Sequence, residues 1–326
     1  MGKKIVWLSV LQGFSMLLVV IGHVSLTNQP GDPSTPIASR IERTIYTFHM
    51  PLFIFISGWL FYHTCIGRKR PYKDMLVAKV KRLAVPFLAF TLVTTLLKVA
   101  FPQLMHRAVD MEEIINTFVL FRSNPLSEMW FLVVLFELML LYPVYAVITR
   151  NKMFAAIALV ITVLLNLFIP EGLTHFQLYR VAYMSPFFVA GILCCRYRWN
   201  DYMGNAWVLA LLALLFVPCN LMGLLPKSME VITASVGIAF SFSLCLILSR
   251  FFPLLFGSFR DYTFQIFLMG IFFQMLIRWI YVKSGNEALF VPMWLLSVLI
   301  GVYVPTLIAI VINKYAPRCI KMCFGL

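Results

Sequence analysis

The sequence predicts an all-α protein that crosses a membrane about ten times. Hydrophobic residues make up 61% of its 326 residues, and the mean hydropathy is +0.89. Only 12% of the residues are charged, and most of these fall between long apolar runs. Soluble domains are about 45–50% apolar, and a membrane β-barrel would alternate polar and apolar residues in segments of about 10. The sequence shows no such alternation, so we expect a polytopic helical bundle.

Ten apolar runs are long enough to cross the roughly 30 Å hydrocarbon layer of a bilayer. They cover residues 5–26, 45–63, 84–101, 128–149, 153–169, 176–195, 205–223, 229–250, 261–282 and 290–313. The first run is too long for a signal peptide and no small-x-small cleavage site follows it, so we expect it to be retained. The chain is therefore expected to form one membrane-embedded domain over residues 1–326, with no appended soluble domain.

The distribution of charge predicts the orientation of this bundle. The net charge is +14, but the cations are divided among short loops, whereas a nucleic-acid site would gather them on one soluble surface. With the N-terminus inside, most of the 27 Lys and Arg residues lie on inner segments, including Arg250 and Arg260 after the eighth span. The positive-inside rule then places both termini in the cytoplasm of a multi-pass protein of the inner (cytoplasmic) membrane. We expect membrane lipids, and no nucleic acid, as partners.

Two histidines in apolar spans are the first candidates for function. Gln12 and His23 are 11 residues apart, so both project from one face of the first span. The second span runs back through the membrane and carries His49 at the depth of His23. Ionisable groups inside a membrane are costly and usually functional, although a neutral histidine can also simply bond across helices. We interpret His23 and His49 as site residues.

Further polar residues fall at the same outer level. Arg180 and Arg278 lie near outer span ends, Glu128 lies at the entry to the fourth span, and Trp130 and Glu137 follow it. Arginines at span ends can snorkel to the interface, whereas Glu137 lies too deep to do so. Together these residues predict an outer pocket for a hydroxylated or anionic acceptor.

A basic cluster follows the second span on the inner side. It comprises Arg68, Lys69, Arg70, Lys73, Lys79 and Arg82. It can act as a topology determinant that also attracts anionic lipid heads, or as a site for a phosphate-rich cytosolic donor. Both interpretations stay open. The sequence has no Walker loop, no H-E-x-x-H, no G-x-S-x-G and no metal-ligand cluster, so no metal site is expected.

Several of these segments resemble the acyltransferase-3 family of integral-membrane acyltransferases. Leu11–His23 is similar to the family's opening helix with its late histidine, and Phe48–Gly58 resembles its most recognisable stretch. Arg82 and Trp130–Leu132 match later features, and the resemblance is strong to about residue 145. The family's usual first-span pattern is an Arg, ten residues and then the histidine, whereas Gln12 stands at the Arg position here.

The resemblance implies ten spans and transfer of an acyl group, often acetyl from acetyl-CoA or another acyl-CoA, to a hydroxyl of a cell-surface sugar or lipid-linked glycan. The donor would lie at Gln12 and the basic cluster, with Arg82 or Lys79 supplying the charge that Gln12 lacks. His23 would accept the hydroxyl proton, and His49 or Glu128 would orient the imidazole of His23 or the acceptor. A transporter or flippase for sugars or lipid-linked oligosaccharides, and a non-catalytic partner in polysaccharide assembly, remain alternatives.

Overall fold

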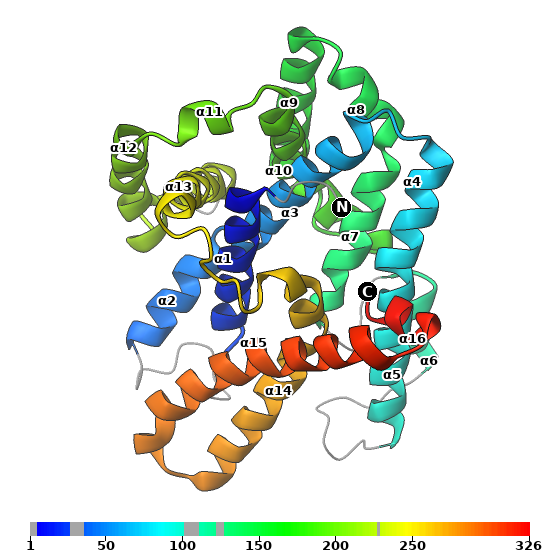
Figure 1. The fold of residues 1–326 in the computed structure, drawn as a ribbon, viewed down its shortest axis with the longest axis vertical. Helices are drawn as coiled ribbons and strands as arrows, with labels where there is room; N and C mark the ends of the chain where they lie inside the picture. The colour runs from blue at the N-terminus through cyan, green and yellow to red at the C-terminus, as the bar shows by residue number, and fades with distance from the viewer. Residues whose placement is uncertain (1–4, 27–35, 101–110, 122–126, 227–228) are drawn as a thin grey trace. The chain divides into compact units, whose positions relative to one another are not determined.

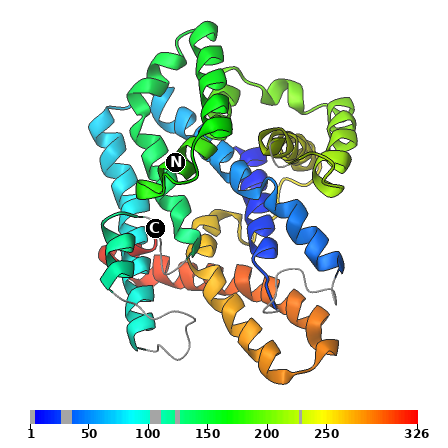
Figure 2. The same cartoon turned by 180° about the vertical axis from the view of Figure 1, so that it is seen from behind.

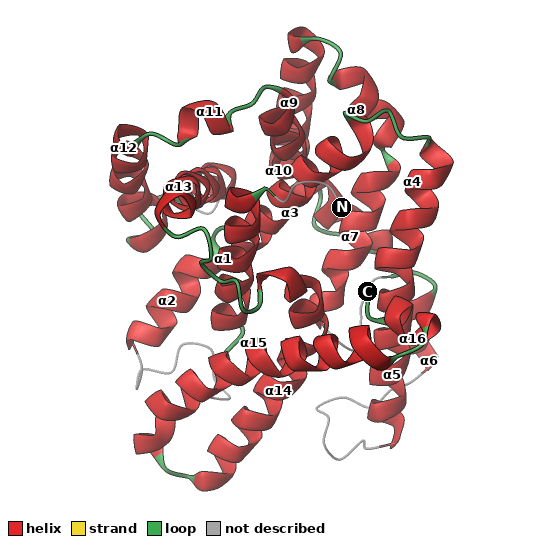
Figure 3. Ribbon diagram, in the orientation of Figure 1, coloured by secondary structure: helices red, strands yellow, loops and turns green. Residues whose placement is uncertain are grey.

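The computed structural model describes residues 5–26, 36–100, 111–121, 127–226 and 229–326. Within these ranges the chain forms helices, turns and loops and no strand (Figures 1 and 3). The predicted all-α class is therefore confirmed. Lys3 and Lys4, part of the first outer loop and the last residue of the third predicted span lie outside the described residues.

The chain divides into two compact units. The first unit comprises residues 1–56 and 198–315. Its helices are α1 (Val6–Gly22), α2 (Pro36–Tyr46), the start of α3 (His49–Phe61), α11 (Asn200–Met203), α12 (Ala206–Phe216), the π-helical turn η6 (Val217–Leu221), α13 (Glu230–Phe251), the 3-10 turn η8 (Arg260–Tyr262), α14 (Thr263–Ser284), η9 (Glu287–Leu289) and α15 (Phe290–Tyr315).

The second unit comprises residues 57–197 and 316–326. Its helices are the remainder of α3, the π-helical turn η1 (Tyr62–Ile66), α4 (Tyr72–Lys79), the π-helical turn η2 (Val80–Ala84), α5 (Val85–Ala100), α6 (Met111–Phe118), η4 (Ser127–Met129), α7 (Trp130–Leu140), α8 (Tyr142–Ile148), α9 (Lys152–Phe168), η5 (His175–Gln177), α10 (Leu178–Arg196) and α16 (Arg318–Cys323).

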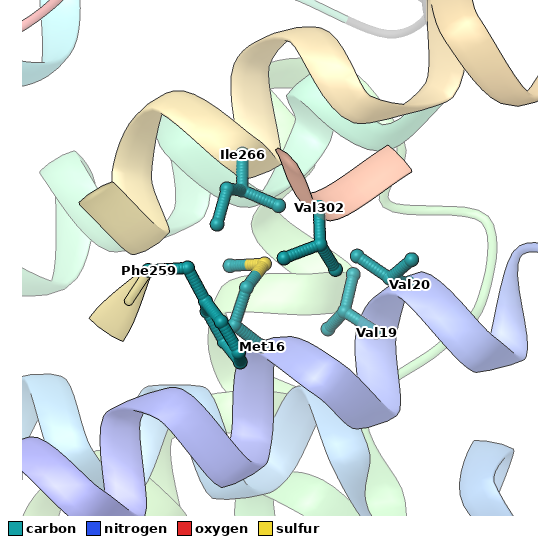
Figure 4. Close-up of a cluster of buried hydrophobic side chains, with 6 residues drawn as sticks. All are labelled: Met16, Val19, Val20, Phe259, Ile266 and Val302. Carbon is teal, nitrogen blue, oxygen red and sulfur yellow. The ribbon is translucent and has the colours of Figure 1, made fainter. Parts of the chain in front are cut away.

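Helix α1 lies at the centre of the first unit. It packs against α13, α14 and α15, and the last two form an antiparallel pair (Figures 1 and 2). A buried apolar cluster joins α1, α14, α15 and the segment just before η8 (Figure 4). Its members are Met16, Val19, Val20, Phe259, Ile266 and Val302. Burial of this cluster fixes the half of α1 that leads to His23.

In the second unit, α10 packs against α9 and α7, and the turn η2 also packs against α7. A Cβ atom at Gly58 would collide with the backbone carbonyl of Phe188 on α10. The glycine therefore lets the end of α3 approach α10 backbone to backbone, which is the use that membrane proteins make of small residues.

Among the described residues, six helices are long and apolar enough to cross a membrane, and a seventh candidate combines α7 and α8. The axes of α7 and α8 differ by a bend of 57°. Pro143 lies in the first turn of α8, and it has no N–H to continue the backbone hydrogen bonds of α7. Three shorter apolar helices, α1, α9 and the pair α12–η6, coincide with three further predicted spans. The total of ten spans and the side on which the termini lie stay predictions.

The basic segment differs from its prediction as an inner loop. Residues 72–84 are helical and continue into α5, so one helix runs from Tyr72 to Leu97. Pro71, in an extended conformation at the N-cap, begins it, as proline commonly does at helix starts. Lys79 and Arg82 therefore lie on a helix, and Arg82 lies in its π-helical turn.

Candidate functional site

The two predicted histidines lie together in the first unit. The ring centroids of His23 and His49 are 5.9 Å apart, with the rings close to perpendicular at 78°. Tyr46 completes the group, with its ring 5.9 Å from that of His23 and 4.9 Å from that of His49. The structure thus brings together the residues expected at matching depth, and it adds Tyr46, which sequence reasoning missed.

Both imidazoles are held in the same way. His23 Nδ1 lies 2.8 Å from the carbonyl of Val19, and His49 Nδ1 lies 2.9 Å from the carbonyl of Ile45. A carbonyl can only accept, so each neutral ring carries its proton on Nδ1 and its lone pair on Nε2. The backbone therefore selects the tautomer in which Nε2 acts as the base.

The two histidines differ in burial. His23 is half-buried, whereas His49 is 2% exposed. His49 Nε2 is buried and has no hydrogen-bond partner among the described residues. A buried acceptor without a partner is costly, so its presence calls for a structural or functional explanation. His23 is therefore the accessible base of the pair, and His49 presents a free acceptor beside it.

Close helix contacts set this geometry. Helix α1 ends at Gly22, where a Cβ atom would lie 3.0 Å from Ile45 Cγ2 and 3.6 Å from Tyr46 Cε2. The lack of a side chain lets the end of α1 lie directly against α2. Two turn residues after Tyr46 separate α2 from α3, so His49 begins a new helix. Pro51 falls in the first turn of α3, where its missing N–H breaks no helical bond.

Gln274 on α14 is a second residue that the sequence did not reveal. It is 5% exposed, and its Nε2 donates to the carbonyl of Val20 at 2.8 Å. That carbonyl adjoins the Val19 carbonyl that holds the ring of His23. Gly301 on α15 makes room for the contact, since a Cβ there would lie 3.1 Å from Gln274 Cγ and 3.2 Å from Val20 Cγ1. Gln274 therefore anchors the last turn of α1.

Arg278 follows Gln274 by one helical turn on α14, so both side chains project from the side that faces α1. Ile277 beside it packs with Val24 and Leu26, just beyond His23. Arg278 is half-buried. The predicted substrate-binding arginine thus lies on the helix that flanks the histidine end of α1.

Asn220, in the turn η6, contacts the break between α2 and α3. The hydroxyl of Thr47 lies 2.6 Å from Asn220 Oδ1 and 2.7 Å from the carbonyl of Thr44. Asn220 is buried, and its Nδ2 has no hydrogen-bond partner in the described part of the chain. The contact ties Thr47, two residues before His49, to a distant segment that carried no sequence signal.

In the second unit, two predicted substrate-binding residues lie in contact. Arg180 stands over the ring of Trp130, with Cζ 4.7 Å from the centroid, and donates from Nη1 to Gln177 Oε1 at 3.0 Å. Gln177 and Phe176 have left-handed backbone conformations, with φ of 55° and 51°. Such conformations cost about 1–3 kcal/mol in residues other than glycine. The start of α10 is therefore a strained segment that positions Arg180.

The predicted carboxylates belong to the same unit. Glu128 lies in the turn η4 and Glu137 on α7, and both are half-buried. The turn η2, which carries Arg82, packs against α7. Glu137 is thus on the helix that the basic segment contacts.

The basic cluster extends from the turn after η1 through α4 to the π-helical turn η2. Arg68, Lys69 and Lys73 are exposed, Arg70 is half-buried, and Lys69 has a left-handed φ of 50°. Lys79 Nζ lies 5.5 Å from the centroid of the Phe61 ring, a cation–π contact that holds it against α3. Arg82 is exposed. Two π-helical turns, η1 and η2, flank the cluster, and such turns are frequent at functional sites.

Comparison with known protein families matches residues 5–313 to the Acyltransferase domain, Acyl_transf_3. The chain belongs to the acyltransferase-3 family. No curated protein and no solved structure matches it. The matched region covers most of both units and includes every residue predicted for the site. This member of the acyltransferase-3 family is accordingly a multi-pass membrane acyltransferase.

The predicted site residues of this acyltransferase divide between the two units. The first unit holds Gln12, His23, His49 and Arg278. The second holds Glu128, Trp130, Glu137, Arg180 and the basic cluster. The outer pocket predicted from all of these residues therefore stays a prediction. Among the described residues no three His, Cys, Asp or Glu side chains gather as metal ligands would.

Proposed function

We propose that this chain transfers an acyl group, acetyl above all, from acyl-CoA in the cytosol to a hydroxyl of a cell-surface sugar or lipid-linked glycan. Membership of the acyltransferase-3 family supplies the reaction class. The observation that carries the proposal is the histidine pair, in which backbone carbonyls hold both rings by Nδ1 and leave Nε2 as a base.

In the proposed reaction the acceptor hydroxyl attacks the thioester carbonyl of the donor. His23 Nε2 takes the hydroxyl proton as the new C–O bond forms. The C–S bond then breaks, and the coenzyme A thiolate leaves and takes up that proton. Atoms and charge balance without a metal or an oxidant, and His23 ends in its starting form.

His49 supports this step through its free Nε2. This atom is a buried acceptor beside His23, so it can hold the acceptor hydroxyl or a protonated His23 ring. Tyr46, half exposed, offers an aromatic face next to both rings. Sugar rings pack on such faces by their apolar C–H surfaces. Burial of His49 strengthens its polar contacts, because the local dielectric is low.

Transfer of label tests the proposal directly. Membranes that contain the protein are incubated with acyl-labelled acetyl-CoA, and surface glycans and glycolipids are compared by mass spectrometry with those from membranes lacking it. The proposal expects label in the glycan fraction and a mass gain of one acetyl group. If glycans accumulate outside the membrane while the label stays on coenzyme A, the protein acts as a transporter.

A further inference from the structure

Arg260 is a buried guanidinium that the histidine chemistry does not use. It lies in the turn η8, just before α14, and is 9% exposed. Its Nη1 donates to the carbonyl of Pro253 at 2.8 Å and to that of Leu255 at 3.0 Å. Its Nε is buried and has no acceptor among the described residues. The sequence had suggested only a cation that fixes membrane orientation.

The turn that carries Arg260 lies along α1. A Cβ atom at Gly13 would lie 2.7 Å from Phe256 Cβ and 3.1 Å from Arg260 Cβ. One turn further along α1, Met16 packs with Phe259 (Figure 4). The stem of the Arg260 side chain therefore lies at the level of Gly13, next to Gln12, near the middle of α1 and more than two helical turns before His23.

The hydrogen bonding of Arg260 leaves one side of the guanidinium unused. In the described part of the chain its bonds both leave from Nη1 and end on uncharged carbonyls. The edge formed by Nε and Nη2 remains, and this edge matches two oxygens of a phosphate or carboxylate with two parallel hydrogen bonds. Its burial makes an unmet charge costly, so an anion at this edge stabilises it.

The neighbouring helix end adds to this preference. Helix α14 starts at Thr263, its N-cap Tyr262 makes no side-chain cap bond, and its first turn has no acidic residue. The N-terminus of a 22-residue helix carries partial positive charge. Arg260 thus precedes Thr263, the first residue of α14 and the positive end of its dipole, by three residues.

We propose that Arg260 binds a phosphate group through its Nε–Nη2 edge, beside the middle of α1 at the level of Gln12 and Gly13. Two sources share this chemistry, namely the phosphates of the acyl-CoA donor and the phosphate of an anionic lipid headgroup. The assignment to acyl-CoA rests on the function proposed above. A phosphate anchored here and a thioester at His23 would place the donor along α1.

Binding to the purified full chain in phosphatidylcholine nanodiscs tests this assignment. The probes are coenzyme A, inorganic pyrophosphate and S-acetylpantetheine, which has no phosphate. We expect Arg260→Gln to weaken coenzyme A and pyrophosphate about tenfold or more, as loss of charge-assisted bonds does, and to leave S-acetylpantetheine unchanged. Arg250→Gln, which removes an exposed cation of the same formal charge, is the control and should retain both affinities.

A second variant separates binding from folding. Arg260→Lys keeps the charge but removes the bidentate edge, so it should fold and still bind pyrophosphate more weakly than the native chain. Equal affinity of the native chain and both Arg260 variants for all probes would show that Arg260 only braces the loop 253–257. The same conclusion follows if the native chain binds neither coenzyme A nor pyrophosphate and is not stabilised by phosphatidylglycerol.

The outcomes also separate this site from the proposed function. Arg260-dependent binding of coenzyme A without any acyl transfer supports the phosphate site and contradicts the function. Acyl transfer with an unchanged KM for acetyl-CoA in Arg260→Gln contradicts a donor-phosphate site. If phosphatidylglycerol alone stabilises the native chain and this effect is lost in Arg260→Gln, the phosphate belongs to a lipid.

Discussion

At the scale of single residues, the same type of hydrogen bond to the backbone fixes the tautomer of both histidines, which differ in burial. Each ring donates from Nδ1 to the carbonyl four residues earlier, which leaves the lone pair on Nε2. The Val19 carbonyl also accepts the backbone N–H of His23 at 3.1 Å, so the ring and main chain of His23 share one acceptor. The half-buried His23 is accessible to a substrate, whereas the buried His49 can contact only groups that enter the site beside it.

Replacement of His23 should remove most of the transfer activity. A positioned general base contributes about 10²- to 10⁴-fold to rate, so we expect His23→Ala to lower kcat by that order while the protein remains folded and inserted. The measurement is the rate of label transfer from acetyl-CoA in membranes with equal protein content. His175→Ala, at an exposed histidine of η5, should keep full activity. Undiminished transfer by His23→Ala would remove His23 from the mechanism.

The sequence revealed some of these residues and hid others for a physical reason. His23 and His49 were visible because an ionisable group in an apolar run is conspicuous. Gln274 and Asn220 were not, because their partners, Val20 and Thr47, lie far away in the chain and meet them only after folding. Arg260 was misleading, since a cation in an inner loop resembles a topology determinant until its burial is known.

At the scale of helices, the contact between α1 and α2 determines how the histidines meet. We expect Gly22→Val to push the end of α1 away, because a Cβ alone would already lie 3.0 Å from Ile45 Cγ2. A displacement of about 1 Å at a reacting centre can cost about 100-fold in rate. Transfer rates should therefore fall to that degree, with a smaller loss of thermal stability.

A matched glycine provides the control for this variant. Gly172 has nothing within 4 Å of its added Cβ, so Gly172→Val should leave both transfer rate and unfolding temperature unchanged. Equal activity of Gly22→Val and the native chain would show that the close approach of α1 and α2 does not matter for the chemistry.

The bond from Gln274 to Val20 should stabilise the catalytic end of α1. Gln274→Leu leaves the buried Val20 carbonyl without its partner, which costs about 1–3 kcal/mol. We expect a lower unfolding temperature and a lower kcat, because the last turn of α1 carries the carbonyl that orients His23. Thr306→Val removes a hydroxyl that bonds within its own helix, and its kcat should not change. A native kcat for Gln274→Leu would limit this bond to stability.

Prediction of helices succeeded where apolar runs were long and failed at their ends. The segment 72–83 was expected to belong to an inner loop because of its charges, yet it is helical. Its Lys and Arg residues are good helix formers, and their long side chains can keep their charges in water beside an apolar body. The bend at Pro143 was likewise missed, since hydropathy averages over a proline that interrupts the backbone ladder.

At the scale of the whole molecule, the ten predicted runs fall, within the part of the chain that the structure describes, on six long helices, one bent pair and three shorter apolar helices. Hydropathy identifies these runs because a spanning segment must satisfy its backbone internally and face lipid. It does not report how far a helix extends beyond the bilayer or how two compact units associate. The charge rule remains the argument for orientation, and accessibility to reagents can test it.

The predicted ten spans would place both ends of the chain on one side of the membrane, and the positive-inside rule predicts that this side is the cytoplasm. Cys319 is exposed on the C-terminal helix α16, and Glu171 is exposed in the turn between α9 and α10. With the other cysteines replaced by serine, a membrane-impermeant maleimide should label Glu171→Cys in intact cells. It should label Cys319 only in inside-out vesicles or after permeabilisation. Labelling of Cys319 in intact cells would contradict an even span count with cytoplasmic termini, and it would place the turn η8 with Arg260 on the outside, because two predicted spans separate this turn from α16.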